Sequence, residues 1–254
     1  MTDDGSTFRK EQFEATIAQI SAALGELDGQ LKAFEDVIRL VAELVGMWAR
    51  IQNSVKNFLE PAYRFIADVY ADLRAASVVP ALYELIPTWQ EAQRSANLIA
   101  ADLTEHRVGA PRYWTGGDSE QYVRAITPQS TAALRLGTHA QVTAVSLGKA
   151  VEFGNTYYKT VESAVIVLVA SVTAGVVGLR ASRGNPVALL AILAVVIGSL
   201  GWTVQSINNG RAAAKTGLDG TCVADLRAER NRVDAFPGDT WPDPFTDRFR
   251  HSRP

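Results

Sequence analysis

Two long apolar segments in the second half of the chain limit its possible folds more than any other feature. Residues 164–179 contain no charged side chain, and neither do residues 187–204; the stretch between them contains two arginines, a glycine and a proline. A helix that is apolar on every face belongs in a large core or in a bilayer. Crossing a bilayer takes about 20 residues, with about 17 as the lower limit, so the first segment is marginal and the second adequate. The pattern predicts an apolar helical hairpin over residues 164–207, which either spans a membrane or is buried in a soluble helical body.

Composition and charge exclude several classes of protein. The chain has 254 residues, of which 47% are hydrophobic and 20% charged, so it can form a sizeable core. Its formal net charge of -2 gives no global attraction for nucleic acid, and we expect no nucleic-acid partner. Cys222 is the single cysteine, which excludes an intrachain disulfide and a thiolate metal cage. Residues 1–6 are polar and acidic and lack the apolar region of a cleavable signal peptide. If the protein leaves the cytoplasm, we therefore expect it to do so without that leader.

Near the N-terminus, apolar residues alternate in steps of four and three, an average of 3.5. This period keeps one stripe of a helix facing a partner helix. The stripe comprises Phe13, Ile17, Ile20, Leu24, Leu27, Leu31, Phe34, Ile38, Val41, Val45 and Trp48. A second stripe comprises Leu40, Leu44, Met47 and Ile51. The sequence therefore predicts one amphipathic helix from about Phe8 to Leu59, covered on two sides in its second half. Its partner helix could belong either to a coiled coil or to an ordinary bundle.

Prolines and capping residues divide the middle of the chain. Pro61 has no amide hydrogen and is expected to kink or restart the helix. Pro80 and Pro87 bracket a short turn-rich element, which we interpret as a boundary. Thr88 then begins a capping box for a helix expected to end near Val108.

A second set of signals follows this helix. Gly116 and Gly117 allow a reversal of the chain without Cβ strain. Pro128 predicts a further helix start after the reversal. A polar helix is expected over residues 219–233, followed by an irregular tail from Phe236. The expected fold is all-α, in four parts: N-terminal amphipathic helices (1–87), a helical hairpin (88–163), the apolar hairpin (164–207), and a polar helix with its tail (208–254).

No pattern in the sequence indicates catalysis. His106, His139 and His251 have no neighbours at metal-ligand spacing. There is no strand pattern, no glycine-rich phosphate loop after a strand, and no Gly-x-Ser-x-Gly elbow. We therefore expect no catalytic residue, no metal site and no cofactor, and a protein that is not an enzyme.

A short pattern begins at Trp114, at the glycine-rich reversal between two predicted helices. It reads Trp114-x-Gly116-x-x-Ser119-Glu120-x-Tyr122, and Tyr158 and Glu162 follow in the second helix. This arrangement resembles the Trp-x-Gly family of helical-hairpin proteins that bacterial type VII secretion systems export, over about residues 88–162. The resemblance implies that Trp114, Gly116 and Gly117 form the hairpin turn. It also implies that Tyr158 and Glu162 form the Tyr-x-x-x-Asp/Glu signal that the export machinery recognises.

These features lead to one principal function and two alternatives. The principal expectation is a non-enzymatic type VII secretion substrate or effector component, from an actinobacterium by its Ala- and Arg-rich usage. Its apolar hairpin would be shielded by the N-terminal helices or by a helical partner or second copy, then meet a membrane. The protein would be secreted or associated with the cell envelope. The first alternative is a resident two-span membrane scaffold with coiled-coil arms, and the second is a pore-forming toxin or its immunity partner.

Overall fold

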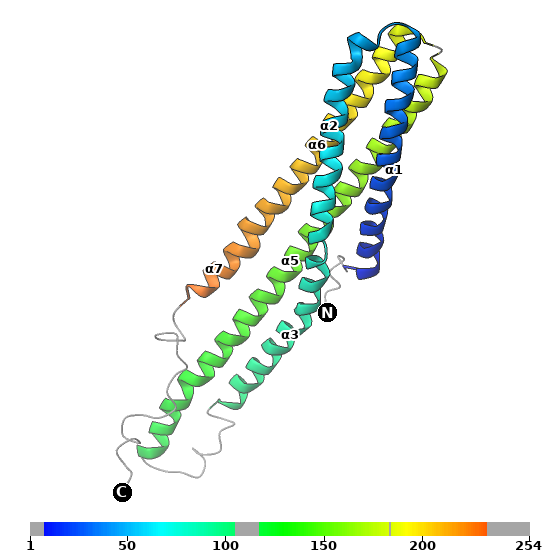
Figure 1. Ribbon diagram of the computed structural model, residues 1–254. Helices are drawn as coiled ribbons and strands as arrows, with labels where there is room; N and C mark the ends of the chain where they lie inside the picture. Colours follow the sequence, from blue (N-terminus) through cyan, green and yellow to red (C-terminus); the bar gives the residue numbers. More distant parts are fainter. Residues whose placement is uncertain (1–7, 105–116, 183, 233–254) are drawn as a thin grey trace. The chain divides into compact units, whose positions relative to one another are not determined.

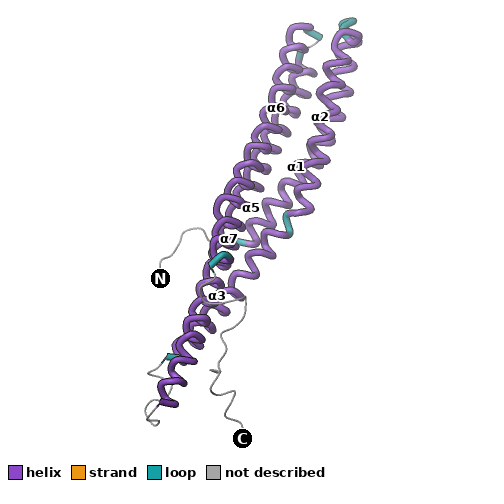
Figure 2. Tube along the Cα trace, turned by 90° about the vertical axis from the view of Figure 1, so that its left-hand side faces the viewer, coloured by secondary structure: helices purple, strands orange, loops and turns teal. Residues whose placement is uncertain are grey.

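The described part of the chain is helical throughout. The computed structural model describes residues 8–104, 117–182 and 184–232, and none of these residues forms a strand (Figures 1 and 2). The elements are α1 (Lys10–Leu44), α2 (Trp48–Ala75), α3 (Val78–Asp102), α5 (Gly117–Ala181), α6 (Pro186–Gly217), the π-helix η1 (Leu218–Val223) and α7 (Ala224–Arg230). The predicted all-α class is confirmed.

The chain divides into two compact units. Unit 1 comprises residues 1–80 and 151–217, and unit 2 comprises residues 81–150 and 218–254. Helix α5 contributes its first part to unit 2 and its second part to unit 1.

Unit 1 is a four-helix bundle in which α1, α2, the second part of α5 and α6 run alternately up and down. Phe13 near the start of α1 packs edge-on against Tyr158 of α5, with ring centroids 5.5 Å apart. Farther along both helices, a Cβ placed on Gly175 would lie 3.2 Å from the Phe34 ring and 2.7 Å from a Val196 methyl on α6. Only glycine therefore allows α1, α5 and α6 to approach one another this closely.

The N-terminal helix is shorter than the sequence predicts. We expected one helix from about Phe8 to Leu59, but α1 ends at Leu44 and the chain turns back into α2. Gly46 lies in the left-handed region with φ +69. Its amide donates to the Glu43 carbonyl at 3.1 Å, and the Met47 amide donates to the Ala42 carbonyl at 2.8 Å. This pair of bonds is the Schellman motif that ends helices at glycine, so Gly46 is a helix stop.

The two apolar stripes have different outcomes. The first stripe lines the core of unit 1, with Leu24, Leu31 and Phe34 among its fully buried members. In the second stripe, Ile51 is buried but lies in α2, after the turn. On α1 itself, Leu40 is 60% exposed and Leu44 is 77% exposed. The expectation that this half of the helix is covered on two sides was therefore wrong.

Three prolines lie inside helices instead of ending them. Pro61, Pro87 and Pro128 are internal to α2, α3 and α5 respectively. All three are exposed, so solvent can hydrate the carbonyl that each proline leaves unbonded. The helix start predicted at Pro128 and the turn-rich element predicted before Pro87 were therefore wrong, and Pro61 does not restart the helix. Thr88 lies within α3 and does not cap it.

Unit 2 contains the predicted pair of antiparallel helices. The Ser130 hydroxyl on α5 donates to the Ala100 carbonyl on α3 at 2.9 Å. Gly137 of α5 faces Asn97 of α3, where a Cβ would collide with the amide side chain. Helix α3 ends at Asp102, earlier than the predicted end near Val108, which lies outside the described residues.

The second half of the chain confirms the apolar hairpin. Gly184 adopts φ +81 between α5 and α6. The Asn185 side-chain oxygen accepts from the amide of Val187 at 2.9 Å, and Pro186 occupies the first helical position. Helix α6 runs past the apolar segment to Gly217, and η1 precedes α7. The predicted polar helix over 219–233 is thus a π-helix and a short α-helix, and the tail from Phe236 lies outside the described residues.

Candidate functional site

One side of the apolar hairpin is covered by α1 and α2, which we call the cover. The large buried aliphatic side chains of the hairpin include Val165, Leu168, Val172, Val176 and Leu179 on α5, and Leu189, Leu193, Val196 and Leu200 on α6. They recur in steps of three and four, as in a packed helical bundle. Most of the remaining positions are also apolar, so the sequence alone could not identify this periodicity.

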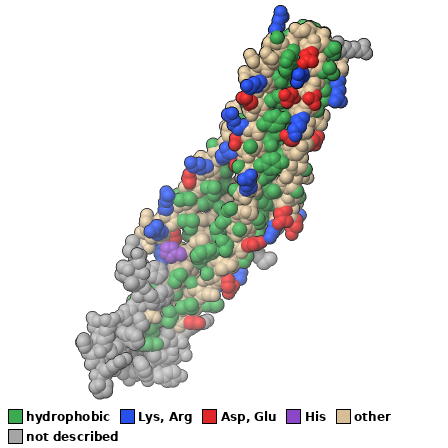
Figure 3. Space-filling view, in the orientation of Figure 1, with side chains coloured by type: hydrophobic (Ala, Val, Ile, Leu, Met, Phe, Trp, Pro, Cys, Tyr) green, Lys and Arg blue, Asp and Glu red, His purple; other side chains and the backbone are tan. Residues whose placement is uncertain are grey.

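The other side of the hairpin is apolar and exposed. We call this surface the apolar face; it comprises Ile166, Val167, Val177, Val187, Leu190, Val195, Ile197 and Trp202. Val195 is 66% exposed and Val177 is 60% exposed. On the surface that Figure 3 shows, hydrophobic side chains gather in long tracts between charged ones. Large exposed apolar patches mark sites of membrane or protein contact, because soluble monomers seldom carry them.

The outer surface of the cover is charged. Ion pairs one helical turn apart join Lys32 to Asp28 at 2.6 Å and Arg39 to Glu43 at 3.0 Å. The first pair is level with the apolar segment of α5, because the nearby Phe34 packs on Gly175. A charge at the centre of a bilayer costs about 2.5–3.5 kcal/mol on translocon scales. Contact between this charged surface and hydrocarbon is therefore unfavourable.

A polar cluster joins the cover to both arms of the hairpin. Arg211 of α6 forms an ion pair with the Asp72 carboxylate of α2 at 2.6 Å. The Tyr157 hydroxyl of α5 donates to the same carboxylate, and the Tyr158 hydroxyl donates to the Asp72 carbonyl at 2.8 Å. Burial raises the pKa of Tyr158 to about 12 and also raises the pKa of Tyr157. The cluster lies beyond the uncharged segments, at the end of the hairpin away from its turn.

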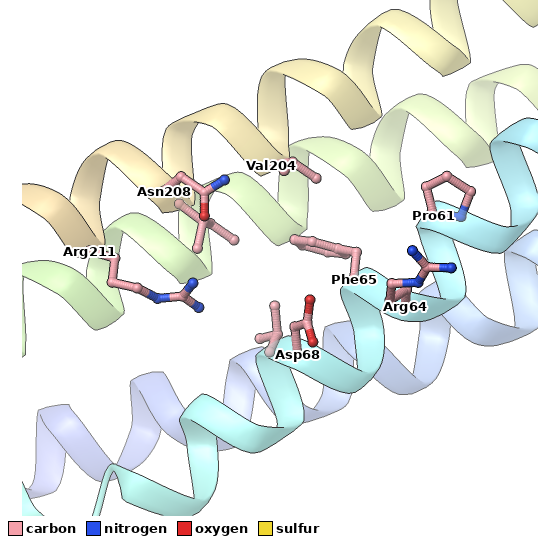
Figure 4. A pocket seen from close by; sticks show the side chains of 9 residues that line it. Pro61, Arg64, Phe65, Asp68, Val204, Asn208 and Arg211 are labelled. Atoms are coloured by element: carbon pink, nitrogen blue, oxygen red, sulfur yellow. The ribbon is translucent and has the colours of Figure 1, made fainter.

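A groove of about 230 Å³ lies between α2 and α6 beside this cluster (Figure 4). Phe65 and Val204 are among its apolar lining residues, and Arg64, Asp68 and Arg211 supply charged side chains. The Arg211 side chain is 51% exposed, so solutes can reach it.

The proposed export signal lies within unit 1. Tyr158 and Glu162 are one turn apart on α5, and Tyr158 is only 5% exposed. The Glu162 carboxylate accepts a hydrogen bond from the Thr16 hydroxyl of α1 at 3.3 Å. The pair therefore faces the cover, and another protein could reach Tyr158 only after α1 and α2 moved away.

The predicted hairpin turn is largely outside the described residues. Trp114 and Gly116 both lie there, and Gly117 is the first residue of α5. The role that the resemblance implies for these three residues stays a prediction.

Unit 2 has an ionic cluster that sequence reasoning missed. Glu229 of α7 is buried and lies 3.4 Å from both Arg135 and His139 of α5. Arg232 approaches the other oxygen of this carboxylate at 3.3 Å. These charges are scattered along the sequence, so no local pattern signals that they meet. Among the described residues, this cluster included, no three His, Cys, Asp or Glu side chains are grouped to hold a metal ion.

Comparisons of the chain with protein-family models, with curated proteins and with solved structures find no match.

Proposed function

We propose that this chain is a non-enzymatic, membrane-active protein whose α5–α6 hairpin inserts into a bilayer. The apolar face supports this proposal most directly: it belongs to two helices long and apolar enough to cross a membrane. The most apolar window is 44% buried in the first helix and 28% buried in the second. A core helix of a soluble protein would be mostly buried, so these helices have more apolar surface than unit 1 can use.

Insertion requires the cover to leave the hairpin, because its charged surface cannot accompany the hairpin into hydrocarbon. Lipid tails can replace the cover, since they are as apolar as the side chains they would contact. The released α1 and α2 each have an apolar stripe and a charged face, which suits helices that lie in the membrane interface. The proposed cycle therefore has a covered state in water and an open state in the membrane.

The route to the membrane is the second part of the proposal. We propose that the chain is carried as a type VII secretion substrate or effector component, with the secretion machinery as its partner. The Trp114-x-Gly116 pattern supports this route, together with Tyr158 and Glu162. Recognition of Tyr158 would take place in the open state, because the covered state buries it. If the double variant Tyr158→Ala, Glu162→Ala is exported from the native host as well as the wild type, the prediction that these residues form the export signal is wrong.

The direct test adds purified protein to dye-filled phosphatidylcholine vesicles and follows both flotation with the vesicles and dye release. We expect the protein to float with the vesicles and to release dye. Protein that stays in the aqueous fraction and releases no dye at high protein-to-lipid ratio would overturn the proposal.

The length of the second segment, residues 187–204, favours one alternative, a resident two-span scaffold. Alkaline carbonate extraction of native membranes distinguishes the resident scaffold from the carried, membrane-inserting protein. A resident protein stays wholly in the pellet and has no soluble pool, whereas a carried protein also has a soluble, covered form.

A further inference from the structure

The Asp72 cluster is a polar contact that joins α2 of the cover to both helices of the hairpin. Asp72 is on α2, and its partners are on the two arms of the hairpin: Tyr157 and Tyr158 on α5, and Arg211 on α6. One further hydrogen bond, from the Thr16 hydroxyl of α1 to the Glu162 carboxylate of α5 at 3.3 Å, lies near the same end of the hairpin. Farther along the hairpin, apolar side chains make the contact, as where Phe34 meets Gly175. One side chain of the cover therefore holds both arms of the apolar hairpin together with α2.

The Asp72 cluster can open without leaving an unpaired charge buried. The Asp72 side chain is 24% exposed and the Arg211 side chain is 51% exposed, so water can solvate both groups when they separate. The Glu229 cluster of unit 2 differs, because the Glu229 side chain is 7% exposed and that of Arg135 is 17% exposed. Separating a buried pair is strongly unfavourable, whereas separating a partly exposed pair costs little. The Asp72 cluster is thus suited to reversible opening.

We propose that Asp72 is an electrostatic latch whose release frees the cover and thereby sets the rate of membrane insertion. The latch rests on the proposed function, because it regulates the same hairpin. Salt screens a partly exposed ion pair, so raising ionic strength loosens the latch. The rate at which the cover opens consequently rises with salt, and Asp72→Asn abolishes that dependence.

Asp72→Asn is the test variant, and Asp68→Asn is its matched control. Asp68 is one turn earlier on α2, is exposed, and lines the adjacent groove. Both changes remove one negative charge from the same helix, but only the first removes the charge that pairs with Arg211. Glu229→Gln is a second control, because it weakens a cluster in unit 2.

The first measurement is hydrogen–deuterium exchange without lipid. Asp72→Asn should raise exchange in α2 by up to about fivefold, as expected when a partly exposed ion pair is lost. The two controls should leave α2 exchange unchanged. Equal exchange of α2 in the wild type and Asp72→Asn would overturn the latch.

The second measurement is the rate of dye release from phosphatidylcholine vesicles, which carry no net charge. Asp72→Asn should release dye several-fold faster than wild type, and its rate should no longer rise with salt. If the wild type releases dye and Asp72→Asn matches it in rate and salt response, the latch is wrong and the proposed function survives. If neither protein releases dye although Asp72→Asn raises exchange in α2, the proposed function is wrong. The role of Asp72 in holding the cover closed is then still supported.

Discussion

Single residues decide where this chain turns. Gly46 and Gly184 both adopt positive φ, which L side chains rarely adopt, and each lies between two antiparallel helices. Gly25 and Gly29 lie within α1 and have ordinary helical backbone. The same residue type therefore ends one helix and merely weakens another.

Gly46→Ala should destabilise unit 1 by about 1 kcal/mol, because alanine is strained in the left-handed region. A Cβ at this position meets nothing within 4 Å, so the cost is purely that of the backbone. Gly25→Ala is the matched control, since its Cβ also meets nothing within 4 Å, and it should stabilise by roughly 1 kcal/mol. Urea unfolding monitored by circular dichroism measures both changes. The same sign for both would contradict the assignment of Gly46 as a helix stop.

Tyr158 makes stability depend on alkaline pH. Burial raises its pKa from the ordinary value near 10 to about 12, so the folded protein holds this proton more tightly than the unfolded chain. The contribution is complete below pH about 10 and is lost as the pH rises through about 12. Tyr158→Phe should therefore lose less stability than wild type between these two pH values. Urea midpoints measured across this range test it, and parallel curves would refute it.

At the scale of elements, three helices continue through prolines that lie at exposed positions. Pro128 lies inside the 65-residue helix α5, although its position suggested a new helix start. The docking of α7 on α5 depends on distant residues, since Glu229 meets Arg135 and His139.

Glu229→Gln should release α7 from α5. Breaking a buried pair by removing one partner typically costs about 3–5 kcal/mol, because the other charge is left uncompensated. Undocking of α7 would let water reach Arg135, so we expect local release and not global unfolding. Hydrogen–deuterium exchange of Ala224–Arg230 reports this release. Asp225→Asn removes an exposed pair with Lys149 at 3.1 Å and should cost less than about 1 kcal/mol. Equal exchange in the two variants would count against the buried cluster as the anchor of α7.

At the scale of the whole molecule, the question is which surface meets a membrane. Unit 1 has an uncharged side made by the hairpin and a charged side made by the cover. Apolar residues are exposed on both, so exposure alone does not identify the membrane-binding surface.

Val195→Lys should abolish vesicle binding while leaving the soluble fold intact. Val195 is 66% exposed, so the lysine can be solvated in the covered state. In the inserted state the same lysine would lie within the hydrocarbon and cost about 3 kcal/mol, a loss of roughly 100-fold in binding. Leu40→Lys is the control on α1, because Leu40 is similarly exposed at 60%. Flotation should be lost for the first variant and largely retained for the second. Loss in both, or in neither, would contradict the apolar face as the inserting surface.

The sequence by itself determined the helical class, the apolar stripe of α1 and the place where the apolar hairpin turns. Each follows from the order of apolar and charged residues along the chain, which sets what a helix must bury. Only the tertiary structure decided that Gly46 is a turn, because a glycine within an amphipathic pattern is compatible with both a helix interior and its end. Only the tertiary structure decided which side of the hairpin is covered and that Tyr158 faces inward. A segment that is apolar on every face contains no information about which neighbour will pack against it.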